Sequence, residues 1–455
     1  MNRRAFLKSG VAAVAAPVIV PRHVLGGEGY TAPSEKITLG GIGIGGIGHP
    51  QLKSCAEVGF EVVALCDVDD NHAKKTYDRF PQARRYRDFR ELLSVEKDRV
   101  DAIYCGTPDH THALITLAAL RAKKHVCCVK PLTRTLEECK LVVEAAKKVG
   151  TATQVTASPW TGETGCRVME LLEAGVIGEV REIHLWSDRP KWPQGMTAYP
   201  TNTDPIPETF DWKLWQGPAE ERPFTSEWAK ESNVPDLVSA SWGGRAVYHP
   251  FNFRGWTAYG TGSLGDMGCH YVNIPYRALK LRYPTRVMAT STRAYSIAYP
   301  LASVVTYDFP AREGLPACQL FWYDGGLRPP VLPKELDGQK LPDGGALYIG
   351  SKGVMLNDQV VTPSLVEKAA AVPKTLVRRG HTFQEWLTAC KGGEKAGCDF
   401  EWASYITDFV LLGNLAIQTG KPVAFDPEAM KVTNNPAADA LIRQPYHNGW
   451  KLAAV

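Results

Sequence analysis

The stretch that decides the fold runs from Lys36 to Pro50 and reads Lys-Ile-Thr-Leu-Gly-Gly-Ile-Gly-Ile-Gly-Gly-Ile-Gly-His-Pro. A short β-prone run enters a turn that holds six glycines, and a helix-compatible run over 51–58 follows. In the pattern G-x-G-x-x-G, the first glycine makes a tight turn and the second lets the backbone approach a pyrophosphate. The third lets the helix pack on the strand. The stretch therefore predicts a strand, a phosphate-binding turn and a helix whose free N–H groups face the phosphates.

Two registers of this pattern fit the glycines. The preferred one is Gly43, Gly45 and Gly48. Pro50 suits the first turn of a helix, which places Gly48 at the exit of the turn. The register Gly41, Gly43 and Gly46 also satisfies the pattern.

The residues that follow the glycine turn also indicate a dinucleotide-binding site. A buried-type strand over 61–66 ends in Asp67, 19 residues after Gly48. That spacing is typical of the carboxylate that binds the ribose hydroxyls of the adenosine. Asp69 and Asp70 add negative charge that would repel a 2′-phosphate, and no arginine directly follows Asp67. The sequence thus favours NAD over NADP as the cofactor.

Strand and helix patterns alternate from residue 37 to about 154, which predicts a doubly wound parallel sheet. Further buried-type strands cover 101–106, 125–128 and 152–155. Ligands in such sheets bind beyond the carboxyl ends of the strands. The glycine turn, Asp67, Thr107-Pro108 and Lys130 all fall at such ends, so we expect them to lie together.

Residues 1–27 predict an export signal rather than part of the fold. Arg3 and Arg4 precede Phe-Leu-Lys and a short apolar run over 10–20, and the arrangement resembles a twin-arginine signal. That run is too short to span a bilayer. A disordered basic N-terminus is the alternative. The twin-arginine route moves folded proteins, so we expect a periplasmic protein that loads its cofactor before export.

Composition is that of an ordinary globular chain of two domains: 455 residues, 44% apolar and 22% charged. Without residues 1–27, which carry four basic and no acidic residues, the net charge falls from +4 to about zero. No basic patch predicts nucleic acid or an anionic membrane as a partner. The eleven cysteines show no zinc-type spacing, and we assign neither a metal nor a disulfide.

The second half differs in composition. All twelve tryptophans lie beyond residue 155, which suggests a domain boundary there. Residues 187–265 form a long irregular segment, typical of functional loops. Within it His249 and Arg254 are candidate binders of hydroxyl or carboxylate groups, with a structural role as the alternative. Short alternating runs after Arg282 predict a largely antiparallel sheet.

Asp266 and His270 are four residues apart, a spacing that puts both on one face of a helix. A carboxylate beside an imidazole can orient it for acid–base work. A surface pair without a catalytic role is the alternative. Pro275 should kink this helix or break it near Tyr271.

Taken together, these motifs resemble the Gfo/Idh/MocA family of oxidoreductases over essentially the whole chain beyond the signal. The matching elements are Gly43 to Gly48, Cys66-Asp67, Thr107-Pro108 with His112, Lys130-Pro131, the run 171–180, and Gly265 to His270. The resemblance implies an α/β fold: an N-terminal Rossmann domain, then an α+β domain with a large, mostly antiparallel open sheet. We expect the domains to cover 28–155 and 156–425, with a tail over 426–455 that packs back on the fold.

The resemblance also implies which residues bind the cofactor and which are catalytic. Cofactor contacts are expected at Gly43, Gly45, Gly46, Ile47, Gly48, Asp67, Thr107, Pro108, His112 and Val129. The expected catalytic residues are Lys130, Asp266 and His270. In this hypothesis His270 takes the hydroxyl proton, Lys130 stabilises the alkoxide and Asp266 orients His270; Lys130 and His270 can exchange roles. One departure stands out: Val129 replaces the glutamate that usually precedes Lys-Pro at the nicotinamide end of the cofactor.

The resulting hypothesis is an NAD-dependent oxidoreductase that acts on a sugar or polyol hydroxyl. Two alternatives remain open on the same fold. One is an NAD-assisted glycosidase that oxidises its sugar transiently, and the other is a non-catalytic, cofactor-bound sugar-binding protein. We expect a carbohydrate substrate, no membrane span and a homo-oligomer.

Overall fold

The computed structural model describes residues 36–229 and 241–452. The predicted export signal lies outside these residues. Contacts divide the chain into one unit over 1–36 and a compact unit over 37–455, and only the second is described below. No helix of the described ranges combines the length and the apolar character that a membrane crossing requires.

The first part of the compact unit is a six-stranded sheet in the order β3-β2-β1-β4-β5-β6, in which every pairing is parallel. The predicted doubly wound sheet is confirmed. Its elements are β1 (Thr38–Ile42), α2 (Gly48–Val58), β2 (Glu61–Cys66), α3 (Asp70–Arg79), β3 (Arg84–Tyr86), α4 (Phe89–Val95), β4 (Ala102–Cys105), η2 (Asp109–Thr111), α5 (His112–Arg121), β5 (His125–Cys128), α6 (Leu136–Val149) and β6 (Thr153–Val155).

The second part carries a seven-stranded sheet in the order β13-β12-β11-β7-β10-β9-β8. All its pairings are antiparallel except that between β7 and β10, so the predicted open, mostly antiparallel sheet is confirmed. Its strands are β7 (Val180–Trp186), β8 (Arg286–Ser291), β9 (Ser303–Phe309), β10 (Cys318–Tyr323), β11 (Gly345–Gly350), β12 (Val354–Leu356) and β13 (Gln359–Val360).

Helices and short elements complete this part. They are α7 (Glu163–Glu173), α8 (Trp212–Gln216), η3 (Asn252–Gly255), α10 (Gly262–Ala278), η4 (Lys334–Leu336), η5 (Pro363–Leu365), α11 (Val366–Ala371), α12 (Thr382–Cys390), α13 (Phe400–Thr419), β14 (Phe425–Asp426), β15 (Lys431–Val432) and α14 (Pro436–Leu441). The predicted break of α10 is wrong, because the helix continues through Pro275 to Ala278.

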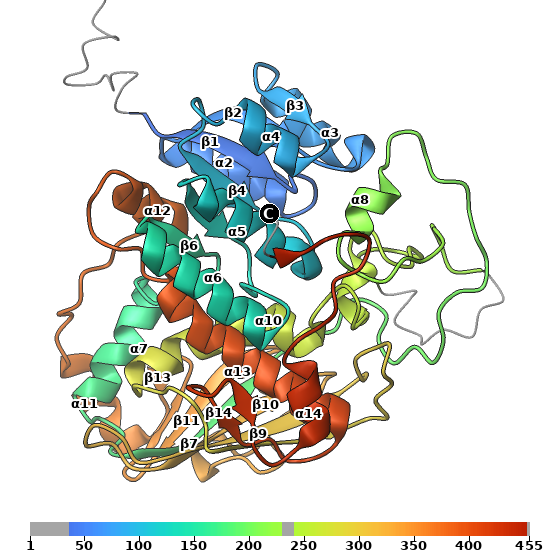
Figure 1. Ribbon diagram of the computed structural model, residues 1–455. Helices are drawn as coiled ribbons and strands as arrows, with labels where there is room; N and C mark the ends of the chain where they lie inside the picture. The colour runs from blue at the N-terminus through green and yellow to red at the C-terminus, as the bar shows by residue number, and fades with distance from the viewer. Residues whose placement is uncertain (1–35, 230–240, 453–455) are drawn as a thin grey trace, which may run out of the picture. The chain divides into compact units, whose positions relative to one another are not determined.

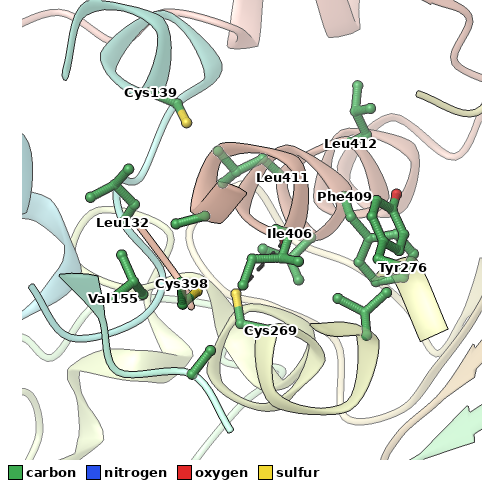
Figure 2. Close-up of a cluster of buried hydrophobic side chains, with 14 of the residues drawn as sticks. Leu132, Cys139, Val155, Cys269, Tyr276, Cys398, Ile406, Phe409, Leu411 and Leu412 are labelled. Carbon is green, nitrogen blue, oxygen red and sulfur yellow. Dashed lines mark hydrogen bonds between the residues drawn. The ribbon is translucent and has the colours of Figure 1, made fainter. Parts of the chain in front are cut away.

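The long helix α13 links the two sheets. It contacts α6 and β6 of the first part and α10 and β8 of the second part, and Figure 1 shows it running beside α6. Figure 2 shows the apolar contact that results, in which Cys269 and Tyr276 of α10 face Ile406 and Phe409 of α13. Because one helix buries its surface against both parts, a continuous apolar core joins them.

Candidate functional site

A cavity of about 710 Å³ lies at the carboxyl ends of the parallel strands. Its wall combines the β1–α2 turn and the ends of β2, β4 and β5 with residues of α10 and of the segment before it. The volume falls within the range of roughly 300–1,000 Å³ that is usual for ligand sites. Of the residues predicted for the site, those that line this cavity are Gly43, Gly45, Gly46, Ile47, Asp67, Thr107, Pro108, Val129, Lys130, His249, Arg254, Asp266 and His270.

Sterics explain the glycines of the turn. Gly43 has φ +72°, and a Cβ there would lie 2.5 Å from the backbone nitrogen of Thr107. A Cβ at Gly45 would lie 2.0 Å from Cδ2 of His72. A Cβ at Gly48 would lie 2.4 Å from the carbonyl oxygen of Gly43, so Gly48 serves the packing of helix on strand and stands behind the cavity wall. Together with the start of α2 at Gly48, these close approaches favour the preferred register.

Helix α2 begins at the turn without a side-chain cap. In its first turn the N–H of Gly48 donates to the carbonyl oxygen of Gly45 at 2.8 Å and Pro50 has no N–H, so the helix contributes chiefly its dipole, which favours negative charge at this end. Cavity size, glycine turn and helix end together fit the pyrophosphate of a dinucleotide.

Asp67 is 7% exposed and holds the turn from the next strand. Its Oδ2 accepts hydrogen bonds from the N–H groups of Ile44 at 2.8 Å and Gly45 at 3.1 Å. Its Oδ1 accepts from the N–H of Asp69 at 3.0 Å. The carboxylate has acceptor capacity left for a ribose hydroxyl, but its first role in the structure is to shape the turn.

His112 does not reach the cavity, which corrects its prediction as a cofactor contact. The side chain is fully buried at the start of α5. Its ring nitrogens lie 2.7 Å from the carbonyl oxygen of Pro131 and 2.8 Å from that of Thr107. His112 therefore ties together two loops that do line the cavity, and it acts as a positioning residue.

Lys130 follows β5 and meets the second part of the chain. Its Nζ lies 2.5 Å from Oδ1 of Asp266, and the same oxygen accepts from Nε of Arg254 at 3.0 Å. The three side chains are 12–18% exposed. Burial opposes ionisation of Asp266, but the charges and hydrogen bonds of Lys130 and Arg254 hold its pKa well below the ordinary value. One carboxylate is thus shared by two cations.

His270 is oriented by Ser158 and not by Asp266. Nδ1 of His270 accepts the backbone N–H of Ser158 at 3.0 Å and lies 3.1 Å from Ser158 Oγ. Among the described residues no hydrogen bond joins His270 to Asp266, so that part of the sequence prediction is wrong. Burial and the charge of Lys130 lower the pKa of His270 to about 3. The ring is therefore neutral at pH 7, and its proton sits on Nε2.

His249 has no nitrogen left for a substrate. Its Nδ1 accepts from Nε1 of Trp215 at 3.1 Å, and its Nε2 donates to Oδ2 of Asp69 at 3.0 Å. The ring also lies 5.0 Å from that of His72, beside the glycine turn. The structural alternative is the correct one for His249, whereas Arg254 lies at the catalytic end.

Several residues of the site were not predicted from the sequence: His72, Arg189, Trp242 and Trp450, which line the cavity, and Ser158, which lies behind it and binds His270. Ser158 follows β6, so the strand-end rule could have found it. Trp450, near the end of the chain, stacks on Phe89 with ring centroids 5.9 Å apart. Asn448 donates to the carbonyl oxygens of Gly217 and Ala219, which brings the C-terminal segment to the adenosine end of the cavity.

Val129 lines the cavity where the glutamate was expected, and it is 7% exposed. It belongs to an apolar cluster with Leu39 and Ile44. The wall beside Lys130 is therefore apolar at this point, and Lys130 takes its carboxylate partner from α10.

Comparisons with known proteins agree with this geometry. Residues 37–157 match the model of an oxidoreductase family with an NAD-binding Rossmann fold. Residues 333–452 match the C-terminal alpha/beta domain of the same family. The two models together cover more than half of the chain, and the first confirms NAD as the predicted cofactor.

Curated relatives include inositol 2-dehydrogenases. That of Salmonella typhimurium is 32% identical over 152 residues, which are 32% of this chain and 45% of the relative. That of Serratia proteamaculans is 31% identical over 183 residues, 39% of this chain and 54% of the relative. The chain spans about half the length of the curated relatives it matches.

Solved structures share the fold at low identity. The WlbA dehydrogenase from Bordetella pertussis, in complex with NADH and UDP-GlcNAcA, matches with a TM-score of 0.58 and 15% identity, over 86% of this chain and 99% of that one. An oxidoreductase from Agrobacterium radiobacter, in complex with NAD+, L-tartaric acid and magnesium, matches with a TM-score of 0.52 and 16% identity, over 87% of this chain and 99% of that one.

Proposed function

The chain belongs to the Gfo/Idh/MocA family of oxidoreductases, and we propose that it is an NAD-dependent dehydrogenase of a sugar or polyol hydroxyl. The observation that carries this proposal is one cavity with a dinucleotide turn at one end and Lys130, Asp266 and His270 at the other. The inositol 2-dehydrogenases among its relatives support the class of substrate.

The cofactor would be held by the glycine turn, the first turn of α2, Asp67 and the Thr107-Pro108 loop. When bound, it supplies the acceptor for the hydride. The protein supplies the proton chemistry and the position of the hydroxyl group.

Of the two sequence hypotheses, the geometry favours Lys130 as the group that takes the hydroxyl proton. His270 already accepts the Ser158 N–H at Nδ1, so its Nε2–H can only donate. Nε2–H then hydrogen-bonds the substrate oxygen and stabilises negative charge that develops there. For oxidation, the Lys130 ammonium group must first release one proton. The proton of the substrate hydroxyl then takes its place on Lys130. Asp266 and Arg254 hold Lys130 in place.

The test uses purified protein with NAD+ and a panel of sugars and polyols, with NADH formation followed at 340 nm. Lys130→Ala should lower turnover by at least about 100-fold, the usual contribution of a positioned acid or base. NAD+ affinity, measured separately by calorimetry, should stay unchanged. Full turnover in Lys130→Ala would exclude this role.

Two further parts of the proposal concern the location of the enzyme in the cell and its oligomeric state. We propose export by the twin-arginine route, supported by Arg3 and Arg4 before the apolar run. Replacing both with lysine should keep a reporter fused to residues 1–27 out of the periplasm, and undisturbed export would contradict it. We also propose a homo-oligomer, which light scattering of the purified protein would test.

A further inference from the structure

Positive charge is in surplus at the catalytic end of the cavity. Lys130 and Arg254 share Asp266, as described above. Arg189, which also lines the cavity, pairs with Asp188, and Asp188 accepts a second cation, Lys191, at 3.2 Å. Four cations in the cavity wall or directly behind it therefore share two carboxylates, with Asp188 and Lys191 standing behind the wall.

The other carboxylates in the cavity wall do not lie among these cations. Asp67 and Asp88 belong to the adenosine end, where Asp67 is engaged by the glycine turn. Asp109 follows Thr107-Pro108 on the cofactor wall, where it accepts the hydroxyl of Thr261. The surplus of cations is thus a property of the region that would receive the substrate.

The two arginines have free donors. Arg254 uses Nε for Asp266 and Nη1 for the carbonyl oxygen of Phe251, and within the described residues Nη2 has no partner. Arg189 gives only Nη1 to Asp188, so its Nε and Nη2 have no partner in the same residues. Both side chains are only 17–18% exposed. Donors in such a setting are usually matched by an acceptor, and here the acceptor must come from a ligand or water.

An aromatic wall joins the two guanidinium groups. Arg189 lies over Trp242 at 4.7 Å, Trp242 lies 5.6 Å from Phe251, and Arg254 lies over Phe251 at 4.4 Å. Trp242 is 64% exposed although it lines the cavity. An exposed indole face between two arginines offers a surface for the C–H face of a sugar ring.

We propose that the substrate is an anionic sugar, with its carboxylate or phosphate group bound by Arg189 and Arg254 and its ring against Trp242. This proposal rests on the proposed function and names its class of substrate. Planar guanidinium groups suit such oxygen anions, because paired N–H donors match paired oxygens. A neutral sugar would leave the surplus charge uncompensated.

The test is a calorimetric titration of the full chain, saturated with NAD+, with D-glucuronate, glucose 6-phosphate and D-glucose. The anionic sugar that fits should bind about 10- to 100-fold more tightly than glucose, the value of charge-assisted hydrogen bonds. Arg189→Gln should remove most of the preference for the anionic sugar over glucose, whereas Arg189→Lys should keep part of it.

Arg181→Gln is the matched control, because Arg181 forms a similar ion pair with Glu179 but is 63% exposed and lies outside the cavity wall. This variant should leave all three affinities unchanged. A second measurement needs no variant: raising the salt concentration should weaken the anionic ligands and not glucose.

Preference for glucuronate would identify a carboxylate as the bound group, and preference for glucose 6-phosphate a phosphate. Glucose binding as tight as that of both anions, without salt dependence, would overturn the proposal. Its failure is distinct from that of the dehydrogenase proposal. Selective anion binding without NADH formation would refute only the redox function, and NADH formation from neutral sugars alone would refute only the charge preference.

Discussion

Adding a methyl group at Gly45 should block the cofactor turn through one neighbour, His72. The Cβ of Gly45→Ala would lie 2.0 Å from Cδ2 and 2.7 Å from Cγ of the His72 ring. Carbon atoms in contact are usually about 3.5–4.0 Å apart, so the ring must move. It cannot move toward His249, whose ring lies 5.0 Å away and is fixed by Asp69 and Trp215. Because His72 lines the cavity, a displaced ring changes the shape of the region where the dinucleotide would bind.

The expected cost follows from this overlap. Overpacking of this kind costs about 1–3 kcal/mol, and the displaced ring should lower NAD+ affinity about tenfold or more. Because the clash lies with a single side chain, His72→Ala in the same chain should restore both quantities. In a double-mutant cycle, the variant that carries both Gly45→Ala and His72→Ala should be more stable than the sum of the two single effects predicts, by more than about 1 kcal/mol.

The assays are chemical denaturation for stability and calorimetric titration for NAD+ binding, on both single variants and the double variant. Gly162→Ala is the control, because its added Cβ would lie 3.6 Å from its nearest neighbour, the carbonyl oxygen of Pro159. Gly162→Ala should show no coupling to His72→Ala. Additive effects of Gly45→Ala and His72→Ala, within about 0.5 kcal/mol, would refute the reasoning.

Three further predictions concern single groups. Burial raises the pKa of Asp408 to about 7, so the folded protein keeps a proton between about pH 4 and 7 that the unfolded chain loses, and stability falls as pH rises there. Asp408→Asn, which keeps an acceptor for the Tyr283 hydroxyl, should be about 2–4 kcal/mol more stable than wild type at pH 8 and equal to it near pH 4 by denaturant unfolding; equal stability at pH 8 would contradict this. Hydrogen bonds from Arg378 are the largest of the effects that lower the pKa of Glu170 to about 2. This carboxylate therefore stabilises the fold above about pH 4.5, and that stabilisation is lost as pH falls toward 2. Glu170→Gln should cost about 2–3 kcal/mol at pH 7 and little at pH 2 in urea unfolding, and an unchanged midpoint at pH 7 would count against the ion pair. Gln at position 270 can place an N–H near Nε2 whereas Asn cannot, so His270→Gln should keep turnover within about tenfold and His270→Asn should lose about 100- to 1,000-fold; equal losses would argue against a donor role.

The strand ends that the sequence predicted to lie together do share a cavity, for a physical reason. In a parallel sheet the carboxyl ends of the strands meet at one edge, so Gly43, Asp67 and Lys130 share a cavity although 87 residues of chain separate the first from the last. The glycine pattern adds local sterics, which depend little on the rest of the fold.

The spacing of residues in the sequence could not predict which side chains bind one another in the folded site. Asp266 and His270 are four residues apart on α10, yet Asp266 pairs with Lys130 and His270 with Ser158, since tertiary neighbours compete with the helical one. His112 begins α5 after the Thr107-Pro108 loop, but its ring nitrogens lie against two backbone carbonyls and the side chain does not line the cavity. Arg189 and Trp242 lie in irregular segments, where no periodicity marks a side chain as part of a cavity.

NAD should occupy the cavity between the glycine turn and Lys130. The most direct measurement is a calorimetric titration of nucleotide-free protein with NAD+ and NADP+, alongside the Gly43→Val variant, whose side chain would meet the Thr107 backbone. We predict one NAD+ bound per chain, tighter than NADP+, and no binding to the variant. Absence of binding of either nucleotide to the wild-type protein, or equal binding to Gly43→Val, would contradict the claim.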